Sequence, residues 1–181
     1  MKRLLLAVLL AGVAASGQSQ ATTKAGGAAG DSGQALVIEV TIPAPLRDVW
    51  QAFTTKEGLS TWLAPDVSVD LKPGGDWLVK FPGSTGGGTI LSFVPEKELV
   101  ISALAPDRFP HVRAARTRAV FTFRAHGNST VVRLTQTGWQ SGPEWDAAYE
   151  YLVAGNGQLL GMLHHRFVAG PVDWKKSEQG Q

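Results

Sequence analysis

The four histidines are the first side chains of this sequence to consider for acid–base chemistry or metal binding. They are His111, His126, His164 and His165. A metal site needs several His, Cys or carboxylate ligands that converge on one ion. Adjacent residues of a helix point about 100° apart, so His164 and His165 do not easily share an ion. We expect no metal site and place these histidines at the surface or at the rim of a cavity.

Nucleophilic catalysis also lacks a candidate. The sequence has no cysteine, no G-x-S-x-G elbow and no Walker motif. Glu96 and Glu98 lie in an expected hairpin turn, where solvation explains them. Glu144 and Asp146 lie in the first turn of an expected helix, where the helix dipole explains them. We therefore predict no catalytic residue, no cofactor and no enzymatic activity.

The segment "AGNGQLLG" at 154–161 begins with G-x-G, a pattern found in nucleotide-binding loops. A dinucleotide site needs a strand before the first glycine and a helix that begins after it, whereas here apolar residues recur at helical spacing on both sides. We interpret the segment as the middle of one helix, in which Gly155 and Gly157 each cost about 1 kcal/mol relative to alanine. A close strand or a kink would account for these glycines.

One face of this helix is apolar at 100° per residue. The face comprises Trp145, Tyr149, Leu152, Leu159, Leu160, Leu163 and Phe167. Asn156 falls on the same face, and a buried amide needs hydrogen-bond partners. Two interpretations of Asn156 stay open: a structural residue bonded to a strand or to loosened helix backbone, or a polar group that points into a cavity.

Aromatic residues are the remaining candidates for a site. The sequence has six tryptophans, and ligand pockets are mostly apolar with a few polar groups. The residues that we predict to line a ligand-binding cavity are Trp62, Trp77, Phe93, Phe121, Trp139, Trp145, Tyr149, Leu152 and Asn156.

The hydrophobic period predicts the elements that would position these residues. Residues 35–42 alternate as a strand does, and a short amphipathic helix follows from Leu46 to Phe53. We expect Gly58 to separate it from a second short helix. A long helix begins at Pro143. Six strands are expected before it, at 66–71, 76–81, 88–94, 98–104, 117–125 and 129–137.

The N-terminus has the pattern of a secretory signal. Lys2 and Arg3 precede an apolar run at 4–13 and small residues at 15–21. The mature protein would be periplasmic or secreted, with no stable membrane anchor after cleavage. The expected organisation is a signal peptide at 1–21, a flexible linker at 22–34, a domain at 35–169 and a flexible tail at 170–181.

The charge of the mature chain disfavours nucleic acid as a partner. Removing Lys2 and Arg3 from the 17 basic residues leaves as many bases as the 15 acids, and binding to phosphate backbones depends on an excess of Lys and Arg. One local basic segment, at 107–118, is interpreted as a solvated loop that enters a strand. It contains Arg108, Arg113, Arg116 and Arg118.

Three stretches carry a resemblance to a known family. They are "VTIPAPLRDVWQAFTTKEGLSTWLAP" at 40–65, "PGGDWLVKF" at 73–81 and "GWQSGPEWDAAYEYLVAGNGQLLGML" at 138–163. Over residues 35–168 the chain resembles the activator of Hsp90 ATPase homologue-like branch of the START-like (SRPBCC) superfamily. The resemblance implies an α+β helix-grip fold. In this fold a curved antiparallel sheet surrounds a long C-terminal helix, two short helices follow the first strand, and an apolar cavity lies between sheet and helix.

Residues and resemblance together leave three functions open. The first is non-enzymatic binding of a small hydrophobic or aromatic molecule in the cavity. The second is a chaperone-like or protein-interaction domain that uses the sheet surface and the basic segment. The third, weaker one is a hydrolase or cyclase-like enzyme with Asn156, Tyr149 or His111 as polar groups. A continuous internal cavity would support the first function, and a solid core with an exposed apolar patch would support the second.

Overall fold

The computed structural model describes residues 33–81 and 84–174, which form seven strands and four helices. The predicted signal peptide at 1–21 and most of the predicted linker at 22–34 lie outside the described residues. The elements are β1 (Leu36–Ile42), α1 (Leu46–Thr54), α2 (Lys56–Leu59), β2 (Val67–Val69), β3 (Asp76–Phe81), β4 (Ser84–Val94), β5 (Glu98–Ala103), α3 (Pro110–Ala115), β6 (Thr117–His126), β7 (Ser129–Thr137) and α4 (Pro143–Ala169).

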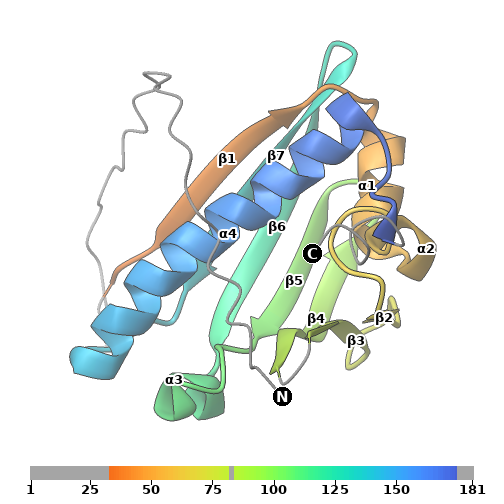
Figure 1. Cartoon of the computed structure of the whole chain (residues 1–181). Helices are drawn as coiled ribbons and strands as arrows, with labels where there is room; N and C mark the ends of the chain where they lie inside the picture. The colour runs from red at the N-terminus through yellow and green to blue at the C-terminus, as the bar shows by residue number, and fades with distance from the viewer. Residues whose placement is uncertain (1–32, 82–83, 175–181) are drawn as a thin grey trace, which may run out of the picture.

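The strands form one antiparallel sheet in the order β1-β7-β6-β5-β4-β3-β2. From β2 to β7 each strand pairs with the next along the chain, as expected for short connections. β1 joins at the β7 edge, with Leu36 opposite Gln136 and Ile42 opposite Thr130. Figure 1 shows the sheet curving around α4, the long blue helix. The predicted α+β helix-grip fold is confirmed.

The long helix α4 is fully buried only near its two ends and is partly buried in its middle. Its buried residues are Trp145 and Ala148 near the start, and Leu160 and Leu163 near the end. No residue from 149 to 159 is fully buried. In Figure 1, α4 runs along β1 from α3 at its start to α1 and α2 at its end. The middle of α4 therefore forms a roof over the sheet.

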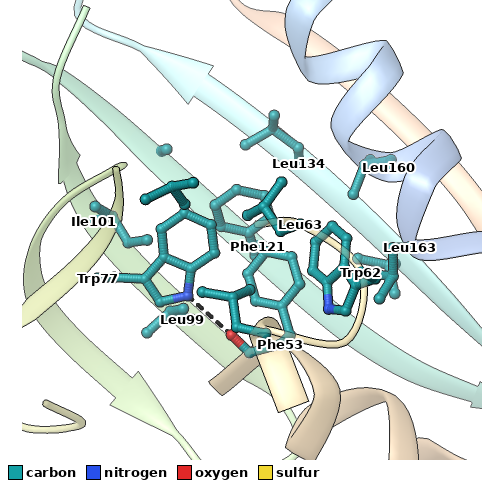
Figure 2. Packing of buried hydrophobic residues seen from close by; sticks show 14 of the residues in the cluster. Phe53, Trp62, Leu63, Trp77, Leu99, Ile101, Phe121, Leu134, Leu160 and Leu163 are labelled. Atoms are coloured by element: carbon teal, nitrogen blue, oxygen red, sulfur yellow. Dashed lines mark hydrogen bonds between the residues drawn. The ribbon is translucent and has the colours of Figure 1, made fainter. Parts of the chain in front are cut away.

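Aromatic residues from α1, β3 and β6 form the centre of the core. The ring centroid of Phe53 lies 5.3 Å from that of Trp77 and 4.8 Å from that of Phe121. The indole N–H of Trp77 donates to the Phe53 carbonyl oxygen at 2.9 Å, the dashed line in Figure 2. The indole of Trp62 likewise donates to the Ala52 carbonyl oxygen at 2.9 Å. Because both indoles have partners, these large side chains are buried without an unsatisfied polar group.

The junction between α1 and α2 differs from the expectation. Thr55, not Gly58, separates the two helices, and its hydroxyl accepts a hydrogen bond from the Gly58 N–H at 3.0 Å. Gly58 lies inside α2, where a Cβ would come 2.3 Å from the Gln51 carbonyl oxygen. The close approach of α1 therefore requires glycine here, whereas the helix boundary does not.

The strand β4 begins at Ser84, four residues earlier than predicted. Its first half is rich in glycine. Gly87 has a φ of +98° and lies opposite Leu78 of β3. A Cβ on Gly88 would come 2.1 Å from the Ser102 carbonyl oxygen of β5. These glycines permit close approach of neighbouring strands, a role that they also have inside sheets.

The basic segment at 107–118 contains the helix α3, so the prediction of a solvated loop is wrong. Arg113 is only 23% exposed. Its Nε lies 2.9 Å from Asp107 Oδ1, and its Nη1 donates to the carbonyl oxygen of Ala105. This arginine is held by local partners and therefore does not belong to a free basic surface.

Beyond α4 the chain returns to the segment that follows α2. The Val172 N–H donates to the Thr61 carbonyl oxygen at 2.8 Å, and the Trp174 indole donates to the Ser60 carbonyl oxygen at 2.6 Å. Residues 170–174 of the expected tail are thus held against the domain. Within the described part of the chain, no helix combines the length and apolarity needed to cross a membrane.

Candidate functional site: a cavity between helix and sheet

A cavity of about 410 Å³ lies between the middle of α4 and the sheet. This volume is within the range of about 300–1,000 Å³ that small-molecule sites occupy. Figure 2 shows Trp77, Ile101 and Phe121 of the floor together with Leu63. Residues of α4 form the roof, among them Leu152, Gly155, Asn156, Leu159 and Met162. Inward-facing residues of the sheet form the floor, among them Trp77, Ile101, Ala119, Phe121 and Gln136.

Small residues on the facing surfaces explain why the core is hollow at this place. Gly155 stands in the roof, and Ala103 and Ala119 stand in the floor. A Cβ on Gly155 would meet no atom within 4 Å. Where α4 instead carries Leu160 and Leu163, the space is filled and both side chains are buried. The absence of a side chain at Gly155 and the two small alanines of the floor contribute to the void.

None of the described residues that line the cavity carries a formal charge. Burying an unpaired charge among such groups costs far more than burying an apolar one. The cavity is therefore suited to an uncharged, mainly apolar molecule. The polar side chains in its lining are Ser84, Thr85, Gln136, Tyr151, Asn156 and Gln158.

A hydrogen-bonded chain of three side chains joins roof and floor. Asn156 Nδ2 donates to Gln136 Oε1 at 2.8 Å, and Gln136 Nε2 donates to Thr117 Oγ1 at 2.7 Å. Gln136 and Thr117 are 3% and 5% exposed. Both interpretations of Asn156 therefore hold in part, because Asn156 bonds to a strand residue and also lines the cavity.

Tyr151 is a lining residue that is also exposed at the surface. It lines the cavity and is 42% exposed. Its ring lies 5.8 Å from the ring of Phe109, and the Arg108 guanidinium carbon lies 3.8 Å from its centroid. Such a cation–π contact holds the ring against the segment that precedes α3. Tyr151 was not among the predicted site residues.

The structure brings four of the predicted residues together at the cavity: Trp77, Phe121, Leu152 and Asn156. Trp62 lies elsewhere, in the solid core beside Phe53. Phe93 is partly buried against the core and does not line the cavity.

The remaining three predicted residues form a separate aromatic cluster near the start of α4. The ring centroid of Trp139 lies 6.5 Å from that of Trp145 and 5.0 Å from that of Tyr149. The Trp139 indole donates to the Gln136 carbonyl oxygen at 3.0 Å, and the Tyr149 hydroxyl donates to the Ala35 carbonyl oxygen at 3.4 Å. This cluster packs the start of α4 against the domain, outside the cavity lining.

Gln136 is another residue of the cavity lining that the sequence analysis did not identify. In a strand with period 2, Gln136 shares the inward face with Val132 and Leu134, which are buried. A glutamine at an inward position of such a strand is a signal that could have been used, since a buried amide must find partners.

His111 and Glu144 form a contact outside the cavity. His111 Nδ1 lies 2.5 Å from Glu144 Oε2, and the backbone N–H groups of His111 and Val112 donate to Glu144 Oε1 at 2.8 and 3.2 Å. The hydrogen bond with the His111 ring is the main reason that the pKa of Glu144 is lowered. The two backbone N–H groups lower this pKa further, whereas desolvation raises it. The carboxylate thus joins α4 to the start of α3. Across residues 33–81 and 84–174, no group of three His, Cys, Asp or Glu side chains is placed to hold a metal ion.

Residues 43–167 match a protein family described as Activator of Hsp90 ATPase homolog 1-like protein. A search among curated proteins found no significant match in sequence.

Several solved structures share the fold. An Aha1 dimer from Colwellia psychrerythraea is similar with a TM-score of 0.63 and 21% identity, covering 76% of this chain and 98% of that one. A protein from Mesorhizobium loti has a TM-score of 0.62 and 20% identity, covering 73% and 95%. CalU16 from Micromonospora echinospora has a TM-score of 0.59 and 21% identity, covering 77% and 76%. At these identities the likeness concerns the fold.

Proposed function

Because the chain belongs to the Activator of Hsp90 ATPase homolog 1-like family and encloses a cavity of ligand size, we propose that it binds a small hydrophobic or aromatic molecule between α4 and the sheet. The observation that carries this proposal is the cavity itself. A domain that acts only through its sheet surface needs no space beneath α4, and leaving a core hollow lowers stability.

The chemistry of the lining supports the same proposal. The walls are apolar, the few polar groups are neutral, and Trp77 and Phe121 offer aromatic faces in the floor. Ligand sites typically combine a predominantly apolar surface with a few polar groups that orient the ligand.

The proposal includes binding without turnover in an exported protein. Among the described residues that line the cavity there is no histidine, cysteine or carboxylate, and its hydroxyls, from Ser84, Thr85 and Tyr151, have no such group in the lining to activate them. The pattern of Lys2, Arg3 and the apolar run at 4–13 supports export.

The experiment uses two substitutions of the same kind on α4. Gly155 lines the cavity and Gly157 does not, and a Cβ at either position meets no atom within 4 Å. Gly155→Leu places a side chain into the cavity, whereas Gly157→Leu changes only the helix. The uncharged fluorescent probe N-phenyl-1-naphthylamine is titrated into the wild type and into each variant.

We expect the wild type and Gly157→Leu to bind the probe alike. Gly155→Leu should bind at least about tenfold more weakly, a loss of about 1.4 kcal/mol. Equal weakening in both variants would assign the effect to the helix, and an absence of probe binding to the wild type would refute the proposal.

A further inference from the structure

The hydrogen bonds around Asn156 specify which kind of group the cavity accepts. Resting on the proposed function, we infer that the bound molecule carries a hydroxyl or N–H group that donates a hydrogen bond to Asn156 Oδ1. The chemical class is an apolar or aromatic alcohol, phenol or amide.

The direction of the hydrogen-bonded chain carries the inference. Gln136 Nε2 donates to Thr117 Oγ1, which turns the amide oxygen of Gln136 toward α4. That oxygen accepts from Asn156 Nδ2. Because Gln136 and Thr117 are almost fully buried, water does not readily replace either partner, and in this arrangement the Asn156 side chain turns its N–H group toward Gln136.

This arrangement leaves the amide oxygen of Asn156 available. Among residues 33–81 and 84–174, no hydrogen bond to Asn156 Oδ1 is present. Asn156 lines the cavity, so a bound molecule can supply the donor that this oxygen lacks. A hydrogen bond from a ligand to a partly buried acceptor contributes most to binding when the protein itself supplies no donor to that acceptor.

The third carboxamide of the lining does not offer the same selection. Gln158 is exposed and takes no part in the hydrogen-bonded chain. An ether or ketone oxygen facing Asn156 Oδ1 would place two hydrogen-bond acceptors against each other. A site built around one hydrogen-bonding group discriminates against ligands that lack the group to pair with it.

A matched pair of probes tests this inference. Titration calorimetry compares 2-naphthol, which has a hydroxyl donor, with 2-methoxynaphthalene, which has only an acceptor, on the full chain. We expect the wild type to bind 2-naphthol about three- to tenfold more tightly. Asn156→Leu removes the acceptor and should abolish this preference. The ratio of the two probe affinities in Asn156→Leu also corrects for the greater apolarity of the ether.

Gln158→Leu is the control, because it removes an amide of the lining outside the hydrogen-bonded chain; it should keep the preference. Asn156→Ala replaces the leucine variant if the latter does not fold.

An identical affinity ratio in the wild type and in Asn156→Leu would overturn the inference while leaving the proposed function intact. A wild-type preference for the ether would also overturn it, since Asn156 would then present its N–H group. If neither naphthalene nor N-phenyl-1-naphthylamine binds, the proposed function fails and the inference fails with it.

Discussion

Glu144 is a residue whose role depends on a part of the chain far from it in sequence. Its carboxylate accepts two backbone N–H groups at the start of α3 and contacts the His111 ring. The helix dipole of α4, which we first used to explain Glu144, acts equally on Asp146 in the same turn. The contacts with α3 distinguish the two acids.

The stability of the domain should therefore depend on the protonation of Glu144. Its pKa in the folded state lies below the ordinary value of 4.5, so the folded protein binds this proton more weakly than the unfolded chain. The stabilisation is present above pH 4.5 and is lost as the pH falls through the lowered pKa. We expect the wild type to unfold at a higher urea concentration than Glu144→Gln at about pH 7. The difference between the two urea midpoints should be smaller at about pH 3.5.

Asp146→Asn provides the control for this titration. Asp146 is exposed, lies in the same helical turn and makes no side-chain hydrogen bond or ion pair with the described residues. A pH dependence for Asp146→Asn as large as that for Glu144→Gln would assign the effect to the helix dipole rather than to α3.

At the residue scale, the sequence predicted the inward direction of side chains where that direction follows from the hydrophobic period of their own helix or strand. Leu152 and Asn156 face inward as the helical phase requires, and Trp77 and Phe121 face inward on their strands. The period does not say how far a residue lies from a void. Trp62 and Trp139 are also inward and buried, but neighbouring aromatic rings surround them instead of empty space. Which inward residues line the cavity depends on packing between distant elements.

At the scale of elements, the period predicted all seven strands and α4, whereas α3 was missed. The helix α3 has only six residues, too few to show a helical period, and isolated helices of this length are unstable. Its support comes from Glu144, 33 residues further along the chain from His111. A contact of that kind leaves no local pattern.

The glycines of α4 also depend on tertiary context. No close strand requires Gly155 or Gly157, because a Cβ at either position meets no atom within 4 Å. Gly157→Ala should therefore raise the free energy of unfolding by about 0.5–1 kcal/mol, since glycine loses more backbone entropy in a helix. Urea unfolding measures the change.

The same substitution in the sheet should have the opposite sign. A Cβ on Gly88 would come 2.1 Å from the Ser102 carbonyl oxygen, so Gly88→Ala should lower the free energy of unfolding by on the order of 1–3 kcal/mol. Stabilisation by Gly88→Ala would show that β4 and β5 are further apart than described.

At the scale of the whole molecule, we predict that the chain is shortened before it acts. The signal pattern at 1–21 should be cleaved between Ala15 and Ala21 during export. N-terminal sequencing of the protein isolated from its native host should give a first residue in this interval. A product that retains Met1 would argue against export and would leave the cavity proposal unaffected.

The two attachments of α4 have a consequence for folding kinetics. The start of α4 is bonded to α3, while near its end Arg166 Nε donates to Thr61 Oγ1, 105 residues earlier in the chain. Contacts over such separations form late, because loop closure is costly in entropy. The helix can form early, but the cavity exists only after α4 has docked. A molecule that binds there therefore stabilises the native state and not the folding transition state, so it slows unfolding and leaves the rate of folding unchanged.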